Sequence, residues 1–470
     1  MPVPRHIPES PTLTEAFARI PRREGRGFRF VGADRSEHFH DHAALWEEAR
    51  RRASLLRDRA GVTAGERVAL VIPDNREFVL TFFGAVLAGA VPVPIFPRAT
   101  FRAIEGYVDV LAHITSASDS RVLVCMEQNR NVIDHLEARP GLPLEKVLVV
   151  EADLRREHAP ETRVHEAQPE DLCFLQFTSG STSKPKGVMV THGNVMANTG
   201  AFLGPHGLDR TDDDCALAWL PLFHDMGLIG FVLGTLAHDI NTVLFPTPTF
   251  ARTPRLWLEL LSAHRATITY APNFGYQLAV KRVRDRDLET LDLSSMRVAG
   301  CGAEPIRART LQEFGERLAP TGFDRRAFLP SYGMAESTLA ITFHPRETEM
   351  VVDRIDPEAM RAGHARPTAA GDVDAGTALE VVSCGVPFPG HGLRIVTEAG
   401  SEAEERQVGE IHIQGPSVTQ GYFRNPEATA AAFTDDGWFK TGDLGYLADG
   451  TLFVCGRVKD LIILNGANHY

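Results

Sequence analysis

The sequence predicts an α/β protein that ends in a smaller β-rich part, and two observations support this fold class. Through the first two thirds of the 470 residues, short apolar runs alternate with stretches of helical pattern. Near-continuous hydrophobic strands separated by helices indicate parallel sheets that are covered on both faces. After about residue 380 the pattern changes to short strands with frequent turns. The chain exceeds the usual size of one hydrophobic core, so we expect several subdomains.

The apolar runs that we predict to be strands are short and are spread along the whole chain. The α/β part contains eight of them, at 67–72, 91–95, 121–125, 146–150, 172–177, 242–245, 267–270 and 296–300. The β-rich part contains three, at 392–397, 409–414 and 451–455. Two stretches have the composition of irregular connections, a polar one at 155–168 and a longer one at 343–382.

Composition excludes several classes of protein. The apolar segment 78–96 is nearly long enough to cross a membrane, but Pro92 and Pro94 interrupt it, and Gly89 begins a turn from a buried helix into a buried strand. A formal net charge of −12 argues against a nucleic-acid partner held by phosphate contacts. The six cysteines form no Cys-x-x-Cys pair and no signal peptide precedes them, so we expect reduced thiols in the cytoplasm.

The most informative motif is TSGSTSKPKG at 178–187, directly after the predicted strand at 172–177. Glycines let the backbone approach a polyphosphate closely, while amides, hydroxyls and ammonium groups bind its negative charge. The spacing differs from that of the common phosphate loop. Taken alone, the motif is also compatible with a flexible polar surface loop.

Five blocks, in a fixed order, resemble the adenylate-forming enzymes, which include acyl-CoA synthetases, luciferases and amino-acid adenylation domains. The loop at 178–187 resembles their phosphate-binding loop, although Ser183 stands where they usually have glycine. The other blocks are WLPLFHDMGLIG at 219–230, GCGAEP at 300–305, SYGMAES at 331–337, and GWFKTGDLG at 437–445 followed by GRVKDLI at 456–462. The resemblance implies the large domain of that superfamily, with two mixed or parallel sheets flanked by helices and a small β-barrel-like subdomain.

The resemblance also implies how ATP and AMP are bound. The implied nucleotide-binding residues are Thr178, Ser179, Gly180, Ser181, Thr182, Gly302, Ala303, Glu304, Ser331, Tyr332, Gly333, Met334, Asp443 and Arg457. Tyr332 and the backbone of 302–303 would enclose adenine, and Asp443 with Arg457 would bind the ribose hydroxyls. An Asp in a Thr-Gly-Asp turn is often only a turn former, which is the alternative for Asp443.

Three residues are implied to take part in the chemistry. Lys186 would hold the β- and γ-phosphates, and Lys184 either assists it or is solvated. Glu336 would bind Mg²⁺, a hard cation that prefers carboxylate oxygens, and its alternative role is a charge at a helix N-terminus. His224 would gate the acyl pocket or bind phosphate, and its alternative is a histidine satisfied at a strand end. The acyl pocket is expected behind 223–230 and 271–278, with the lining residues Phe223, Met226, Gly227, Gly230, Asn273, Phe274 and Gly275.

The length of one interval favours a particular subfamily. Glu336 and Gly385 lie 49 positions apart, and this interval is much shorter in acyl-CoA synthetases. Fatty acyl-AMP ligases resemble those synthetases but carry an insertion here, which is held responsible for rejecting coenzyme A. The blocks APNFGY at 271–276, SCG at 383–385 and GPSV at 415–418 also resemble that subfamily. A tolerated surface insertion without function is the alternative.

The resemblance therefore implies that a fatty acid and ATP become acyl-AMP and pyrophosphate with Mg²⁺, before transfer to the phosphopantetheine of an acyl carrier protein. The nearest alternative is an acyl-CoA synthetase. An amino-acid adenylation domain is disfavoured because the pocket blocks offer no obvious acidic partner for an α-ammonium group. A non-catalytic acyl or nucleotide sensor is the alternative of another class, and the intact Lys186, Glu336, Asp443 and Arg457 argue against it.

The end of the chain resembles the opening of the small C-terminal domain of these enzymes. Lys459 matches the hinge residue about which that domain rotates, and the lysine that it supplies to adenylation matches none of the six lysines here. We therefore expect a large domain at 1–456, with its β-subdomain at about 381–456 and its insertion at 343–382. The residues 457–470 would be the hinge and a truncated small domain, and adenylation by this chain would be slow.

Overall fold

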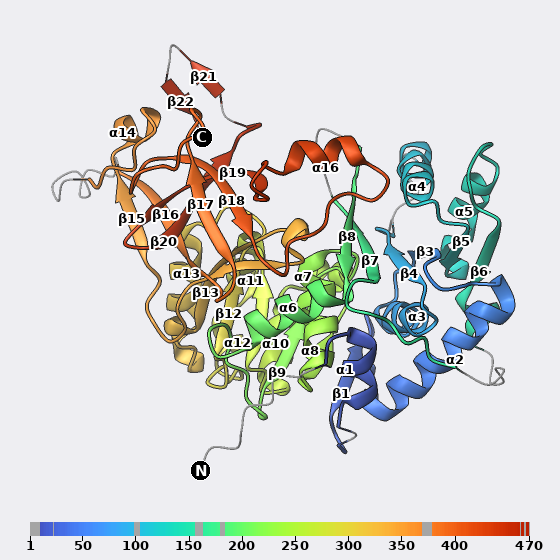
Figure 1. Ribbon diagram of the computed structural model, residues 1–470. Helices are drawn as coiled ribbons and strands as arrows, with labels where there is room; N and C mark the ends of the chain where they lie inside the picture. The colour runs from blue at the N-terminus through green and yellow to red at the C-terminus, as the bar shows by residue number, and fades with distance from the viewer. Residues whose placement is uncertain are drawn as a thin grey trace. The chain divides into compact units, whose positions relative to one another are not determined.

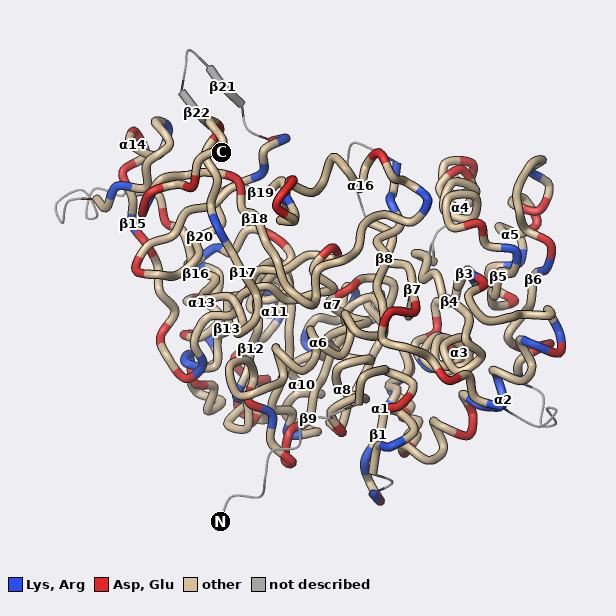
Figure 2. Tube along the Cα trace, in the orientation of Figure 1, with Lys and Arg blue, Asp and Glu red and all other residues tan. Residues whose placement is uncertain are grey.

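A computed structural model describes residues 10–21, 23–97, 104–155, 163–178, 184–368, 378–460, 462–464 and 467–469, with side chains up to 460. The chain divides into two compact units. The first unit comprises Met1–Gly200, Trp219–Thr247 and Thr419–Thr429, and the second comprises Ala201–Ala218, Pro248–Val418 and Ala430–Tyr470. In both units the Lys and Arg residues are interspersed with Asp and Glu along the trace (Figure 2).

The first unit contains a four-stranded parallel sheet with the strand order β4-β3-β5-β6. Its elements are β3 (Arg67–Val71), α3 (Asn75–Leu87), β4 (Val91–Pro94), α4 (Ile104–Ser118), β5 (Val122–Cys125), α5 (Arg130–Glu137) and β6 (Lys146–Val149). Helices α2 (His42–Ala60) and α3 lie on one side of this sheet, and α4 and α5 lie on the other (Figure 1). The four predicted strands and their parallel arrangement are therefore confirmed.

The apolar segment 78–96 folds as a helix, a turn and a strand. Helix α3 begins after Asp74, whose side chain accepts a hydrogen bond from the backbone of Glu77, and it ends at Ala88. Gly89 then takes a φ of +80°, a conformation that glycine adopts without strain, and the chain enters β4. Within the described residues, no helix is long and apolar enough to span a membrane.

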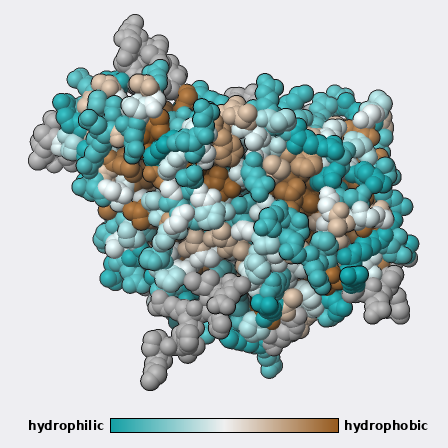
Figure 3. Space-filling view, in the orientation of Figure 1, coloured by the Kyte–Doolittle hydropathy of each residue, from teal (hydrophilic) through white to brown (hydrophobic). Residues whose placement is uncertain are grey.

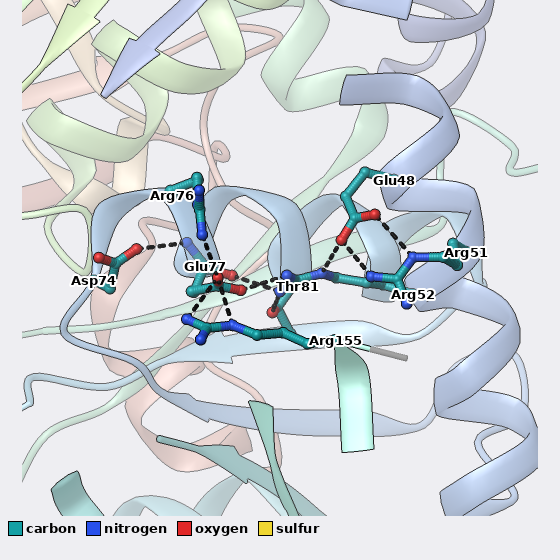
Figure 4. A network of polar contacts seen from close by, with 8 residues as sticks. All are labelled: Glu48, Arg51, Arg52, Asp74, Arg76, Glu77, Thr81 and Arg155. Carbon is teal, nitrogen blue, oxygen red and sulfur yellow. Dashed lines mark hydrogen bonds and ion pairs between the residues drawn. The ribbon is translucent and has the colours of Figure 1, made fainter. Parts of the chain in front are cut away.

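A buried network of charges joins α2 to α3 (Figure 4). The side chain of Arg52 is 1% exposed; it forms an ion pair with Glu77 and donates a hydrogen bond of 2.6 Å to the Thr81 hydroxyl. Arg155 contacts the other oxygen of Glu77 at 2.9 Å. Burial acts to raise the pKa of Glu77, but the charges and hydrogen bonds of these arginines together hold it below its usual value. The network therefore depends on an ionised Glu77.

The predicted strand at 172–177 is confirmed, but its pairing differs from the expected parallel arrangement. Strand β7 (Leu172–Phe177) forms an antiparallel hairpin with β8 (Gly187–Thr191), and α6 (His192–Leu203) follows. The physical reason is the short connection at 178–186, because a parallel pair needs a crossover of a dozen or more residues.

In the rest of the first unit, the predicted strand at 242–245 is confirmed as β10, whereas the sequence did not reveal the strands β1 and β2. The sheet β10-β1-β2 pairs β1 in parallel with β10 and antiparallel with β2. Its elements, with the helices nearby in sequence, are α1 (Leu13–Arg19), β1 (Gly27–Val31), β2 (Glu37–Asp41), α7 (Asp225–Leu228), α8 (Gly234–Ala237) and β10 (Asn241–Leu244). Strand β2, with the sequence EHFHD, is mostly exposed and polar, so its composition gives no apolar signal.

The second unit begins with a parallel sheet that continues into antiparallel strands. Strands β9, β11, β12 and β13 are parallel neighbours. The elements of this part are β9 (Cys215–Ala218), α9 (Thr247–Arg252), α10 (Arg255–Ala263), β11 (Ile268–Ala271), α11 (Asn273–Arg282), α12 (Asp285–Leu288), β12 (Val298–Cys301), α13 (Ala308–Leu318) and β13 (Phe328–Gly333). The predictions at 267–270 and 296–300 are confirmed to within two residues.

The β-rich part follows in the order β13-β14-β16-β20-β19-β18-β17, with antiparallel pairing throughout. Its elements are β14 (Ala340–Phe343), β16 (Leu379–Pro387), β17 (Gly392–Val396), β18 (Gly409–Gln414), α16 (Pro426–Ala432), β19 (Phe439–Ala448), β20 (Thr451–Arg457), β21 (Ile462–Leu464) and β22 (Ala467–His469). The three predicted strands are confirmed as β17, β18 and β20. The α/β class, with a large mixed sheet and flanking helices, is confirmed as well.

The stretch 343–382 was predicted to be irregular, and this prediction is wrong for much of its described part. It contains β15 (Val352–Ile355), which pairs antiparallel with β16, and the short helix α14 (Pro357–Arg361). Asp356 caps that helix by accepting hydrogen bonds from the backbone of Glu358 and Ala359. The composition masks these elements because each is very short. The most linker-like residues, 369–377, lie outside the described residues.

Candidate active site

Reciprocal hydrogen bonds hold together the two ends of the predicted phosphate loop. The backbone nitrogen of Thr178 donates to the carbonyl of Lys186 at 3.0 Å, and the backbone nitrogen of Lys186 donates to the Thr178 hydroxyl at 3.3 Å. The predicted residues Ser179, Gly180, Ser181 and Thr182 lie outside the described residues. Lys186 is half-buried whereas Lys184 is exposed, so the two lysines of the motif are not equivalent.

His224 lies directly before α7 and is paired with its neighbour. Its Nδ1 is 2.6 Å from a carboxylate oxygen of Asp225, and 42% of its side chain is exposed. The negative charge of Asp225 raises the pKa of His224, although burial opposes this effect. The same Asp225 oxygen accepts a hydrogen bond of 2.7 Å from the backbone of Met226. Because Nδ1 faces Asp225, Nε2 is left for another partner, and as an N–H donor it would suit the binding of an anion.

The two predicted adenine blocks lie side by side at the ends of neighbouring strands. Strands β12 and β13 are parallel, and Cys301 is opposite Pro330, so the residues that follow each strand share one edge of the sheet. A Cβ atom on Gly302 would lie 3.0 Å from the carbonyl oxygen of Ser331, which leaves little room for any other residue. Ala303 adopts a φ of +66°, so the turn is tight. Ligands of open α/β sheets bind at such carboxyl ends of strands.

Two of the predicted residues make structural bonds next to this turn. Glu304 accepts a hydrogen bond of 2.7 Å from the backbone of Phe274, at the start of α11. Asn273 accepts one of 3.0 Å from the backbone of Arg307 and donates to the Thr310 hydroxyl at 3.3 Å. These bonds fasten the predicted acyl-pocket segment 271–278 to the block that follows β12.

The predicted ribose carboxylate, Asp443, is buried and has two donors on different oxygens. The Tyr332 hydroxyl donates to one oxygen at 2.7 Å, and Nε of Arg457 donates to the other at 3.1 Å. Asp443 and Arg457 are opposite each other on β19 and β20. Burial raises the pKa of Asp443, and the hydrogen bonds from Tyr332 and Arg457 oppose that rise. The structure thus brings Tyr332, Asp443 and Arg457 together, and it contains a direct Tyr332–Asp443 bond that the sequence did not reveal.

The loop that carries Glu336 is closed by its own backbone. The nitrogen of Met334 donates to the carbonyl of Leu339 at 2.9 Å, and the nitrogen of Leu339 donates to the carbonyl of Ser337 at 2.7 Å. The second bond encloses Thr338 in a tight turn with φ +65° and ψ −63°. A side chain at Gly333 would collide with the Leu339 carbonyl, so this position requires glycine. Glu336 itself is 8% exposed.

Thr338 is strained and is held in place by a second segment. A β-branched residue at positive φ costs on the order of 1–3 kcal/mol and persists only where its surroundings fix it. Here its hydroxyl donates to the carbonyl of Ser417 at 2.7 Å, and the Ser417 hydroxyl contacts the His391 imidazole. No sequence signal marks Thr338, because backbone strain has no compositional signature. The strained turn lies two residues from Glu336, where it fixes the backbone of that loop.

The predicted acyl-pocket residues are divided between the two units. Phe223, Met226, Gly227 and Gly230 belong to the first unit, and Asn273, Phe274 and Gly275 belong to the second. Gly227 is required by packing, since a side chain there would collide with the Pro221 carbonyl. Phe274 is 47% exposed. The face shown in Figure 3 is largely hydrophilic, with some apolar patches. In the first unit, Phe223 packs edge-on against Phe96, with ring centroids 5.0 Å apart.

The predicted insertion is anchored to the β-rich part by the carboxylate of Asp353, whose side chain is 11% exposed. Asp353 on β15 accepts hydrogen bonds of 2.8 Å from the Tyr446 hydroxyl and from Arg406. Ile355, Met360 and Ala365 are buried in one apolar cluster with Tyr446 and Phe453. The described part of the insertion is therefore packed against β19 and β20, in contrast to a loosely attached surface loop.

A comparison with known protein families identifies the class of this protein. The model of the AMP-binding enzymes matches residues 29–423, which is most of the chain. The chain belongs to the family of AMP-binding enzymes.

Individual relatives narrow this class to ligases that form acyl adenylates. The chain is 39% identical to a Caulobacter vibrioides protein named as an acyl-CoA synthetase, over 87% of this chain and 70% of that protein. It is 35% identical to the long-chain-fatty-acid–AMP ligase FadD26 of Mycobacterium marinum, over 94% of this chain and 77% of that protein.

Two solved structures that are similar to this chain also come from work on fatty acyl-adenylate ligases. One from a study of fatty acyl-adenylate ligases of E. coli and L. pneumophila has a TM-score of 0.92 and 35% identity, over 99% of this chain and 83% of that one. The L. pneumophila fatty acyl-adenylate ligase, solved with acyl adenylate and pyrophosphate, has a TM-score of 0.86 and 29% identity, over 96% and 78%. These findings confirm the predicted family and the predicted enzyme class, an adenylate-forming ligase with fatty acyl-AMP ligases among its relatives.

Proposed function

We propose that this enzyme activates a fatty acid with ATP to form acyl-AMP and pyrophosphate, and that the acyl group then passes to the phosphopantetheine of an acyl carrier protein. The observation that carries the proposal is the Tyr332–Asp443–Arg457 arrangement, beside the block after β12, in a chain of the AMP-binding family. A buried carboxylate with a raised pKa is costly to keep ionised, and such groups gather at functional sites. The relatives named as fatty acyl-AMP ligases support the choice of acid.

The proposed phosphate and metal contacts use few protein groups. Thr178 and Lys186, with the residues between them, would hold the β- and γ-phosphates that leave as pyrophosphate. Glu336 would contribute a carboxylate oxygen to Mg²⁺. Among the described residues, no group of three or more His, Cys, Asp or Glu side chains gathers into a metal site. Mg²⁺ is typically held by one or two carboxylates together with substrate phosphates and water, so a single glutamate is sufficient for this role.

The chemistry needs charge neutralisation and positioning rather than a covalent group on the protein. The attacking carboxylate and the α-phosphate are both anionic, so fixed cations and dipoles lower the barrier most effectively. We propose that Lys186 and the imidazolium of His224 supply positive charge in the first unit. The Tyr332 ring and the 302–304 turn would hold adenine, and Asp443 with Arg457 would hold the ribose. Lys459 would act as the hinge residue.

An acyl-CoA synthetase is the second candidate, and the relative of that name at 39% identity favours it. We propose that the insertion excludes coenzyme A, and the contacts of Asp353 and of the apolar cluster, which fix its described part against β19 and β20, support this proposal. We also propose a cytoplasmic location. All six cysteines are free, and burial raises the pKa of both Cys125 and Cys384 to about 12, as suits thiols that stay reduced.

A comparison of acceptors distinguishes a ligase that serves a carrier protein from an acyl-CoA synthetase. The enzyme would receive radiolabelled fatty acids of graded chain length with ATP and Mg²⁺, and then either free coenzyme A or a phosphopantetheinylated carrier protein. We expect acyl-AMP in both reactions and thioester formation only with the carrier protein. Acyl-CoA formation at a rate like that of adenylation would contradict the carrier-protein proposal. The variant Lys186→Met provides the inactive control.

A further inference from the structure

The aromatic ring of Tyr422 lies under the ammonium group of Lys186. The Nζ atom of Lys186 is 4.1 Å from the centroid of the ring, well within the distance at which a cation and an aromatic face attract each other. Tyr422 is buried, with 6% of its surface exposed, and Lys186 is half-buried. Both residues belong to the first unit.

The backbone around Tyr422 is fixed against the strand that follows the phosphate loop. Tyr422 forms an antiparallel bridge with Val188 on β8. The nitrogen of Phe423 donates to the carbonyl of Gly187 at 2.8 Å, and the nitrogen of Met189 donates to the carbonyl of Gly421 at 3.1 Å. The hydroxyl of Thr419 also donates to the carbonyl of Met189, at 2.6 Å. The ring therefore has a defined place next to the end of the loop, although it is more than two hundred residues away in sequence.

An aromatic ring can fix the position of a lysine side chain without neutralising its charge, which a carboxylate cannot do. A long lysine side chain loses up to about 2 kcal/mol of rotamer entropy when it is fixed, and a prepositioned side chain loses less of it on binding. A carboxylate would also neutralise the ammonium charge and compete with phosphate for its donors, whereas a ring face leaves the charge and the N–H groups available. Within the described part of the chain, Lys186 forms no ion pair with a carboxylate.

We propose that Tyr422 is a positioning residue, which orients the Lys186 ammonium toward the polyphosphate of ATP before ATP binds. The inference rests on the proposed phosphate role of Lys186 and extends it to a residue outside the five sequence blocks. It also distinguishes the two lysines of the loop, because Lys184 is exposed and Lys186 rests on the ring.

The neighbouring residue supplies a matched control. On the same segment, the Phe423 ring carries the guanidinium groups of Arg67 at 5.4 Å and of Arg424 at 5.7 Å, longer distances that are still within the range of cation–ring attraction. Arg67 is already committed elsewhere, since it donates to Asp119 at 2.7 Å and to the carbonyl of Ser118 at 2.9 Å. Removal of the Phe423 ring thus removes a comparable cation–ring contact that has no proposed link to ATP.

The kinetic test compares three variants. Tyr422→Leu should raise the KM for ATP by roughly 2- to 30-fold, the range that such contacts cover, and leave the KM for fatty acid unchanged. Tyr422→Phe keeps the ring and should retain the wild-type KM for ATP, which separates the ring from the hydroxyl. Phe423→Leu should also leave that KM unchanged. A normal KM for ATP in Tyr422→Leu, or an equal rise in Phe423→Leu, would overturn the inference.

A double-mutant cycle then shows whether Tyr422 acts through Lys186. If it does, Tyr422→Leu causes no further rise of the Kd for ATP, measured by calorimetry without turnover, in a Lys186→Met background. If each single variant weakens ATP binding and the two effects add, the positioning role of Tyr422 is overturned while the phosphate role of Lys186 stands. A normal Kd for ATP in Lys186→Met would overturn the phosphate role of Lys186, and the inference with it.

A spectroscopic readout keeps the test valid if Tyr422→Leu folds poorly. Reductive ¹³C-methylation would label the few lysines of the chain, and Lys186→Arg would identify the signal of Lys186. We expect this signal to be shifted upfield by the Tyr422 ring in the wild type and in Tyr422→Phe. A Lys186 signal at the position typical of a solvated lysine in both proteins would overturn the inference.

Discussion

Replacement of Tyr332 by phenylalanine tests the ribose site while leaving an aromatic ring for adenine. The change removes only the hydroxyl that donates to Asp443 at 2.7 Å. Asp443 then keeps the Arg457 donor on its other oxygen, but 67% of the Arg457 side chain is exposed, so that donor is less firmly placed. We therefore expect the carboxylate to lose its fixed orientation.

The size of the effect follows from the type of bond that is lost. A hydrogen bond to a charged group contributes about 1.5–3 kcal/mol. If that amount is lost from the binding of ATP in the transition state, kcat/KM for ATP falls by roughly 10- to 150-fold. The KM for fatty acid should change little, because the substitution removes only the hydroxyl that donates to Asp443 and alters no residue of the predicted acyl pocket.

The pH dependence gives a second and more specific readout. Burial raises the pKa of Asp443, and the Tyr332 hydroxyl opposes that rise. Without the hydroxyl the pKa rises further, so the fall of kcat/KM for ATP on the acid side should begin at a higher pH in Tyr332→Phe. Initial rates of pyrophosphate release, measured across pH at limiting ATP, would show this shift. An unchanged kcat/KM together with an unchanged acid limb would refute the reasoning.

A second variant, Asp443→Asn, separates the functional role of Asp443 from its effect on stability. Since the folded pKa of Asp443 lies above its unfolded value, its contribution to stability is complete below the unfolded pKa and is lost as pH rises through the folded pKa. Ionised Asp443 thus costs folding free energy at neutral pH. Asp443→Asn should therefore melt at least as high as the wild type while losing most of its ATP-dependent activity. A large drop in its thermal midpoint would indicate a structural role instead.

Three further predictions concern the metal, the insertion and the buried charges. Glu336→Ala should abolish Mg²⁺-dependent adenylation while leaving the circular dichroism spectrum unchanged, and full activity would remove Glu336 from the mechanism. Deletion of 364–376 should leave adenylation largely intact and admit coenzyme A as acceptor. It should also lower the thermal midpoint, because the backbone nitrogen of buried Ala365 donates a bond of 2.8 Å to the carbonyl of Arg406. Continued rejection of coenzyme A would show that the barrier lies elsewhere. Glu77→Ala should lower the free energy of unfolding in urea by up to about 3–5 kcal/mol, because the buried Arg52 loses its buried carboxylate partner and keeps only the ion pair of 3.2 Å with Glu48. Since the folded pKa of Glu77 is lowered, this difference should be complete above the ordinary carboxyl pKa of 4.5 and shrink as pH falls below it, and a constant difference would contradict the assignment.

The sequence predicted most of the α/β framework because its strands carry a strong local signal. Val68, Leu70, Leu123 and Val124 belong to continuous apolar runs that are buried on both faces of a parallel sheet, and such runs are visible without tertiary information. The polar strand β2 and the short elements β15 and α14 carry no such signal. Their stability comes from tertiary partners, as Asp353 illustrates through its bonds to Tyr446 and Arg406.

Motifs gave the residue types of the candidate site, but not the bonds that orient them. Tyr332, Asp443 and Arg457 come from blocks that are about a hundred residues apart, and only the register of β19 on β20 and the packing of β13 reveal that they touch. The strain at Thr338 and the ring of Tyr422 under Lys186 depend on backbone geometry and on long-range pairing. Neither could be predicted from a single sequence.

The central claim is that the reaction product is an acyl adenylate, and direct detection of that product tests the claim most directly. The enzyme would be incubated with ATP, Mg²⁺ and a ¹³C-labelled fatty acid, without any thiol acceptor, and the quenched mixture would be analysed by mass spectrometry alongside a pyrophosphate assay. We predict acyl-AMP that carries the label and pyrophosphate in equal amounts, both dependent on the fatty acid and both lost in Lys186→Met. Release of pyrophosphate without labelled acyl-AMP, or release of ADP and phosphate in its place, would contradict the account.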